Sequence, residues 1–152
     1  MTASRPSRRG IRSRCPVVAA VVALALGIPT LASAESFNAR LIESQDAAAK
    51  ELAHTAQVAI ETYATDNNGS YKGASPKVLD EYDSMIPIRP PRGLAALSDP
   101  YLSLAQSLDG GRGYLVATVS ASGDVFGIGR APNGTLVRVC KGFSLTCHHG
   151  RW

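Results

Sequence analysis

The sequence predicts an α+β domain, in which one long N-terminal amphipathic helix packs on an antiparallel meander of three strands or slightly more. Two observations support this class. Over residues 37–65 apolar residues recur every three or four positions, whereas after residue 113 they recur every second position. Because the helical pattern comes first and the strand pattern follows, without alternation between them, the elements are segregated as in α+β folds.

The first 34 residues have the pattern of an export signal. Five arginines lead into an apolar run at 17–26, and Gly27-Ile28-Pro29 ends this run. Ala32-Ser33-Ala34 fits the small-residue pattern that precedes signal-peptidase cleavage. We therefore expect a signal peptide at 1–34 and a mature domain at 35–152, secreted or held outside the cytoplasm in the cell envelope.

Two alternatives concern this N-terminal segment. The apolar residues at 17–31 could be retained as a membrane anchor, although a bilayer span needs about 20 apolar residues and this run is shorter. Ser7-Arg8-Arg9-Gly10-Ile11 matches a twin-arginine export signal only in part, because Ile11 occupies the expected aromatic position. Cleavage and the general secretory route are the preferred interpretation.

The charge of the mature part argues against a nucleic-acid-binding protein. The whole chain has 16 basic and 12 acidic residues, a net charge of +4. Five of the basic residues precede residue 35 and no acidic residue does, which leaves 11 basic residues against all 12 acidic ones. A nucleic-acid-binding domain requires a basic face, and the mature part has no excess of basic residues to supply one.

The segment 37–65 predicts a helix with one apolar side. The stripe consists of Leu41, Gln45, Ala48, Leu52, Ala56, Ala59 and Tyr63, all apolar or aromatic except Gln45, with Ile42, Ala49, Ala53 and Ile60 beside it. The other side carries Glu43, Asp46, Lys50, His54, Gln57 and Glu61, which we interpret as solvated. Since alanine is small, a flat sheet can approach the stripe closely. Asp66-Asn67-Asn68-Gly69 ends the helix, because Asn and Gly accept the left-handed conformation of a helix C-terminus.

A short helix and a loop region are expected next. Ser75 can cap a helix that starts at Pro76 and runs to about Met85. Prolines then exclude regular structure up to Arg92, and 94–108 is expected to be a loop with a helical turn.

The last third of the chain predicts the meander. The expected strands are 114–120, 125–130 and 136–140, separated by turns at Ser122-Gly123-Asp124 and Pro132-Asn133-Gly134. Asn-Gly between two alternating segments is the strongest short hairpin signal. The apolar stripe of the helix and one face of this sheet would form the core.

Two cysteines remain after Cys15 leaves with the signal. Cys140 and Cys147 form an even pair in an oxidising compartment, which predicts a disulfide. Chain entropy gives roughly 2.5 kcal/mol for a bridge of this loop size. The alternative is a zinc site formed with His148 and His149, but adjacent histidines near a chain end point apart and the cysteines are expected to be oxidised.

No catalytic, cofactor or metal residue is expected elsewhere. Glu43, Asp46 and Glu61 share a helix side but are spread over several turns, unlike a catalytic pair. Asp80, Glu81, Asp83 and Asp109 lack the regular spacing of a calcium loop. The Gly-rich stretch at 110–113 lacks the strand and helix that flank a phosphate-binding loop.

The order of these features resembles a known family. ETYATDNNGSY at the helix end, GYLVATVSASGDVFGIGRAPNGTLVRVC in the strand region and the terminal cysteine loop are similar to the globular domain of type IV pilins and type II secretion pseudopilins, particularly pilin-like proteins of Gram-positive actinobacteria. The resemblance covers residues 46–152. It implies a pilin-like fold and a bridge between Cys140 and Cys147.

The N-terminus departs from this family. In the family a long apolar half-helix follows the cleavage site, whereas here the apolar run precedes the expected cut and polar residues such as Asp46 and Lys50 follow it. The resemblance therefore implies a non-enzymatic, exported pilin-like protein with a structural, binding or accessory role at the cell envelope. The expected partners are envelope proteins, with membrane contact only if the signal is retained. A membrane-anchored pseudopilin is the alternative, and a secreted hydrolase, which needs a polar cleft, is less favoured.

Overall fold

The computed structural model describes residues 30–147 and 149–152, with side chains from residue 36 onward, and Ser36–Trp152 form one compact unit. The apolar run of the expected signal lies almost wholly outside the described residues. The elements are α1 (Thr30–Asp66), α2 (Pro76–Tyr82), the 3-10 helix η1 (Gly93–Leu97), β1 (Tyr101–Leu108), the 3-10 turn η2 (Asp109–Gly111), β2 (Gly113–Val119), β3 (Val125–Arg130) and β4 (Leu136–Lys141). In the part of the chain that is described, no helix has the length and apolar character of a membrane span.

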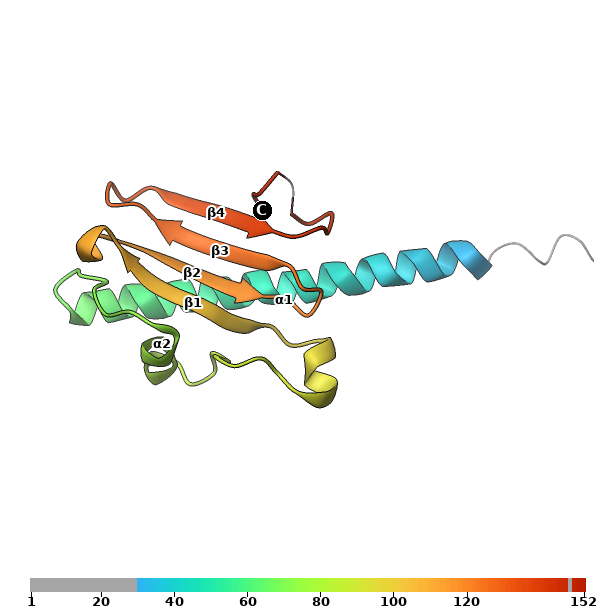
Figure 1. The fold of residues 1–152 in the computed structure, drawn as a ribbon, viewed down its shortest axis with the longest axis horizontal. Helices are drawn as coiled ribbons and strands as arrows, with labels where there is room; N and C mark the ends of the chain where they lie inside the picture. The colour runs from blue at the N-terminus through green and yellow to red at the C-terminus, as the bar shows by residue number, and fades with distance from the viewer. Residues whose placement is uncertain (1–29, 148) are drawn as a thin grey trace, which may run out of the picture. The chain divides into compact units, whose positions relative to one another are not determined.

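The sheet has four antiparallel strands in the order β1-β2-β3-β4, and α1 lies across one of its faces (Figure 1). The predicted α+β class and the three predicted strands are confirmed. The expectation of a loop over 94–108 is only half right, because η1 is the helical turn but β1 is a strand. The pairing of β1 with β2 shifts between Leu102 and Leu104, and this irregularity breaks the alternation that would have identified the strand.

The core lies between α1 and the sheet. Its members from α1 are Leu52, Ala53, Ala56, Ala59, Ile60 and Ala64, and those from the strands are Leu102, Ala105, Tyr114, Val116 and Ile128. The expected alanine-rich contact with a sheet is therefore present. The N-terminal part of the predicted stripe is not buried, however, since Leu41 and Ala48 are exposed. Among the residues whose side chains are described, every buried hydrophobic one lies from Ala49 onward, so the described core falls within the expected mature domain.

Hydrogen bonds fix α1 on the sheet as well. The buried Thr118 hydroxyl donates to the carbonyl of Ala49 at 2.8 Å. Tyr114, Val116 and Thr118 of β2 point towards α1, so the residues between them, Leu115 and Ala117, lie on the opposite face of the sheet.

The predicted end of the long helix and the predicted start of the short one are confirmed, whereas α1 begins at Thr30, seven residues before the predicted start at 37. Asn68 and Gly69 have φ angles of 56° and 80°, which end α1 in the left-handed region. The Ser75 side chain accepts a hydrogen bond from Val78 N and Pro76 opens α2. This helix ends at Tyr82, a few residues earlier than expected.

Candidate functional site

A disulfide closes a small loop after β4. Cys140 is bonded to Cys147, as predicted, which closes the segment 140–147. Within it we call residues 142–147 the tail loop. Because both sulfurs are bonded to each other, neither is a thiolate ligand for zinc. His148 lies outside the described residues, and no group of three or more potential metal ligands occurs among the residues that are described. The bond is consistent with an oxidising compartment.

Asp46 in α1 holds one side of the tail loop. The Ser122 hydroxyl donates to Oδ1 of Asp46 at 2.5 Å, and the Thr146 hydroxyl donates to Oδ2. Asp46 is fully buried, so its assignment to a solvated helix side is wrong. The turn after β2 and the tail loop cover this part of the helix.

The electrostatics of Asp46 follow from this enclosure. Burial opposes ionisation of the carboxyl group, but the hydrogen bonds from nearby serine and threonine hydroxyls outweigh burial and lower its pKa. The side chain is therefore a carboxylate whose charge is stabilised by hydrogen bonds from neutral hydroxyl groups.

Asp124, in the turn between β2 and β3, holds the other side of the tail loop. Its two carboxylate oxygens accept hydrogen bonds from the backbone N–H groups of Phe143 and Ser144, each at 3.1 Å. Gly142 makes this approach possible, because a Cβ at that position would lie about 2.0 Å from the carboxylate. Together with Asp46 and the disulfide, Asp124 fixes the conformation of the tail loop.

The fixed tail loop presents apolar side chains outward. Ser144 and Thr146 face the domain, where their hydroxyls are hydrogen-bonded to each other. The alternate residues Phe143 and Leu145 are 106% and 82% exposed. With Ile42 of α1 they border a mainly apolar groove of about 390 Å³. Internal polar contacts thus support a loop whose apolar residues make few contacts within the described domain.

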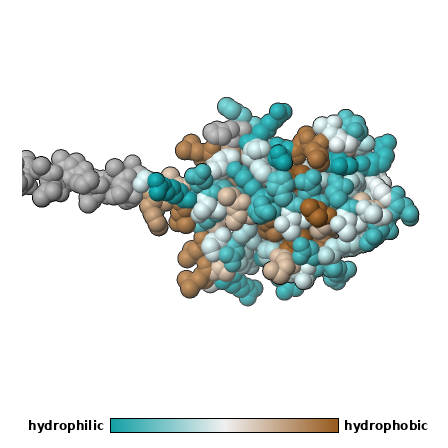
Figure 2. All heavy atoms as spheres, turned by 180° about the vertical axis from the view of Figure 1, so that it is seen from behind, coloured by the Kyte–Doolittle hydropathy of each residue, from teal (hydrophilic) through white to brown (hydrophobic). Residues whose placement is uncertain are grey.

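A second exposed apolar segment lies beside the same stretch of α1. The Gln45 side chain donates a hydrogen bond to the carbonyl of Leu97 at 2.5 Å, which holds η1 against the helix. Six exposed residues around this part of α1 form a surface that we call the apolar collar: Phe37, Leu41, Leu94, Leu97, Phe143 and Leu145. Figure 2 shows hydrophobic side chains gathered at the left end of the domain around α1.

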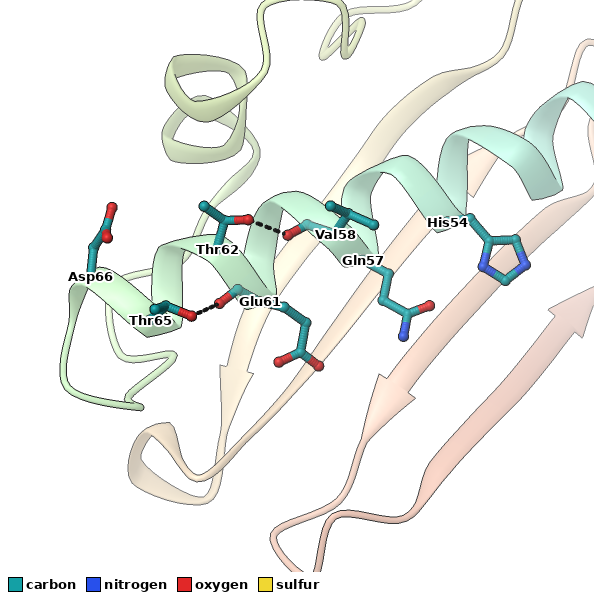
Figure 3. A pocket seen from close by; sticks show the side chains of 7 residues that line it. All are labelled: His54, Gln57, Val58, Glu61, Thr62, Thr65 and Asp66. Atoms are coloured by element: carbon teal, nitrogen blue, oxygen red, sulfur yellow. Dashed lines mark hydrogen bonds between the residues drawn. The ribbon is translucent and has the colours of Figure 1, made fainter.

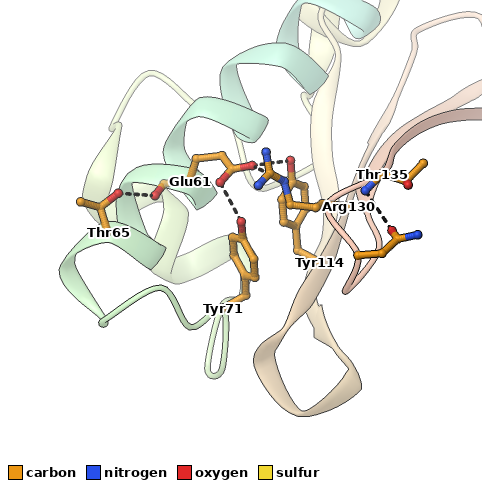
Figure 4. A network of polar contacts seen from close by, with 7 residues as sticks. Glu61, Thr65, Tyr71, Tyr114, Arg130 and Thr135 are labelled. Carbon is orange, nitrogen blue, oxygen red and sulfur yellow. Dashed lines mark hydrogen bonds and ion pairs between the residues drawn. The ribbon is translucent and has the colours of Figure 1, made fainter.

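A separate polar network centres on Glu61 (Figure 4). The hydroxyls of Tyr71 and Tyr114 donate to its two carboxylate oxygens at 2.7 and 3.1 Å. Arg130 Nε lies 3.1 Å from Glu61 Oε1, an ion pair without the angles of a hydrogen bond. The expectation that Glu61 is a solvated charge is therefore wrong, since it joins α1 to β2, β3 and the loop that follows the helix.

The two tyrosines of this network stay neutral over a wide pH range. Burial, followed by the hydrogen bond to Glu61 and its negative charge, raises the pKa of Tyr71 to about 12. Burial and the Glu61 charge also raise the pKa of Tyr114. Because both carboxylate oxygens are occupied and the phenols are held protonated, this network supports a structural role.

The hollow beside Glu61 is formed by one face of a single helix (Figure 3). All of its lining residues come from α1: His54, Gln57, Val58, Glu61, Thr62, Thr65 and Asp66. A ligand pocket buries most of the surface of its ligand, whereas a hollow along one face of a single helix leaves its contents open to solvent. His54, expected to be solvated, is half-buried because its ring packs edge-on against Trp152 at 5.6 Å. Glu43, by contrast, is exposed as expected.

The sequence interpretation missed Asp124 and the outward residues of the tail loop. A usable pattern was present, because polar and apolar residues alternate from Phe143 to Thr146 inside the disulfide loop. No local pattern identifies the buried acids, since their partners are distant in sequence.

Comparison with known proteins gives no relatives for this chain: no family model, no curated protein and no solved structure matches it.

Proposed function

We propose that this chain is an exported, non-enzymatic, pilin-like protein that has a structural or binding role at the cell envelope. In this proposal it is an accessory of a type IV pilus or type II secretion machine. The carrying observation is the tail loop, in which a disulfide and two buried carboxylates fix a short segment that presents Phe143 and Leu145 to the outside. Exposed apolar patches of this kind are typical of interaction surfaces.

The arrangement of elements also supports the proposal. A long helix across an antiparallel meander, followed by a disulfide-closed tail, agrees with the organisation implied by the resemblance to pilins and pseudopilins. The polar groups that could suggest catalysis have other partners. Glu61 is bound by two tyrosines, and Asp46 by two hydroxyls. These contacts favour a binding role over the hydrolase alternative.

Cell fractionation combined with N-terminal sequencing tests the proposal. We expect the chain outside the cytoplasm, with the Cys140–Cys147 bond formed and a mature start at Glu35. A chain that retains 17–31 and fractionates with membranes would favour the anchored pseudopilin. A full-length, cytoplasmic chain with two reactive thiols would contradict export and with it the proposed function.

A further inference from the structure

The apolar side chains of the collar protrude in a way that suits insertion into a lipid surface. Its residues project from three separate segments: the start of α1, η1 and the tail loop. Phe143 and Leu94 are 106% and 86% exposed, so they protrude from the domain. Protruding side chains need a partner with matching pockets if that partner is a folded protein, whereas a lipid surface accommodates them without preformed pockets.

The charges along the same segments suit an anionic surface. Arg40 lies next to Leu41, Arg92 directly precedes η1 with Arg89 three residues before it, and Lys141 directly precedes the tail loop. All four side chains are exposed. Among the described side chains of these segments, the exposed acidic ones are Glu43 and Asp99, while Asp46 is buried and hydrogen-bonded. Along the described residues of these segments, four exposed cations therefore stand against two exposed anions, whereas the mature chain as a whole has no excess of basic residues.

The position of the collar in the sequence also favours lipid. The apolar run at 17–31 ends six residues before Phe37, and the arginines of the N-terminus precede this run. If this run directs export across a membrane, Phe37 and Leu41 of the collar are the first collar residues to follow it on the outer side. The first collar residues therefore emerge closest to the lipid, whether or not the run is later removed.

We propose that the apolar collar binds the surface of an anionic phospholipid membrane, with Phe143 and Leu145 of the rigid tail loop, Leu94 and Leu97 of η1 and Phe37 of α1 entering the interface. Cationic side chains around the collar contact the lipid headgroups. This inference deepens the proposed function by naming the partner of the domain at the envelope, and it rests on that extracytoplasmic location.

Vesicle flotation with residues 35–152, which include the compact unit Ser36–Trp152 and its described core, tests the inference. The probes are phosphatidylcholine vesicles with and without phosphatidylglycerol. We expect the domain to float with the anionic vesicles, less so at high salt, because salt screens the cation contacts. The double variant Phe143→Ser, Leu145→Ser should bind at least tenfold more weakly.

A matched control removes two exposed apolar side chains elsewhere. Val58 and Met85 are exposed but lie outside the collar, so Val58→Ser with Met85→Ser should leave vesicle binding unchanged. Circular dichroism confirms that each variant is folded. The charge variant Arg89→Gln, Arg92→Gln should weaken binding to anionic vesicles and reduce its salt dependence.

Three results would overturn the inference. The first is that the unmodified domain floats with neither kind of vesicle. The second is that the tail-loop variant binds vesicles as well as the control variant does. The third is a dimer in sedimentation that the tail-loop variant abolishes while vesicles stay unbound, which would assign the collar to a second copy of the chain. An exported chain that fails to bind vesicles contradicts the lipid partner alone, so this failure is distinguishable from failure of the proposed function.

Discussion

Replacement of Asp46 by Asn tests whether the buried carboxylate stabilises the domain. In the native structure its oxygens accept hydrogen bonds from Ser122 and Thr146, and the side chain is fully buried. A hydrogen bond to a charged group contributes about 1.5–3 kcal/mol. Asn keeps one acceptor oxygen but places an NH₂ group where the Thr146 hydroxyl donates. The expected loss is therefore about 2–3 kcal/mol of the free energy of unfolding, the value of one charged hydrogen bond together with a mismatched donor.

Urea denaturation with the disulfide intact measures this loss, with Glu43→Gln as the control. Glu43 lies one turn earlier on α1 and is exposed, so its neutralisation should change stability by less than about 0.5 kcal/mol. The pH dependence supplies an independent test. The pKa of Asp46 is lower in the folded state than its ordinary value of 3.8. The stabilisation by the carboxylate is therefore present above about pH 4 and is lost as the pH falls through the folded-state pKa.

Two results would refute this reasoning. If the Asp46→Asn variant and the Glu43→Gln control are equally stable at pH 7, the hydroxyl contacts contribute nothing. If the difference between the Asp46→Asn variant and the unmodified domain stays constant from pH 7 to pH 2, the effect does not come from the charge.

The remaining predictions concern the Glu61 network and the tail loop. Tyr71→Phe should cost about 1–2 kcal/mol, since it removes a hydrogen bond to a carboxylate. Because the pKa of Tyr71 is raised to about 12, its contribution is fully present below pH 10 and is lost above it. The variant should therefore lose less stability between pH 10 and 12 than the unmodified domain, and equal alkaline losses in a denaturation series would contradict this. Gly142→Ala should destabilise by about 1–3 kcal/mol, because the new Cβ displaces Asp124. Hydrogen exchange should then show faster exchange at the amides of Phe143 and Ser144, and unchanged rates would rule out the clash. Reduction of the Cys140–Cys147 bond should lower stability by roughly 2.5 kcal/mol. Calorimetry measures the fall in melting temperature, and titration showing two free thiols in the native protein would refute the bond.

The secondary structure was predictable wherever local patterns encode it. The three- and four-residue period of α1, the Asn-Gly turn before β4 and the cap at Ser75 all depend on residues close in sequence. β1 was missed for a physical reason: its pairing shifts between Leu102 and Leu104, so its buried residues do not alternate. The sequence alone also placed two cysteines seven residues apart, and the structure joins them.

Burial of the polar residues was decided only by the tertiary structure. Asp46, Glu61 and His54 share one side of a helix, and helical periodicity assigns them all to solvent. Asp46 is instead covered by Ser122 and Thr146, which lie 76 and 100 residues away along the chain. Periodicity predicts which residues share a face, but coverage of that face depends on segments that approach from elsewhere. For the same reason, the exposure of Phe143 and Leu145 depends on Asp46 and Asp124, which lie far away in sequence and hold the polar side of the tail loop.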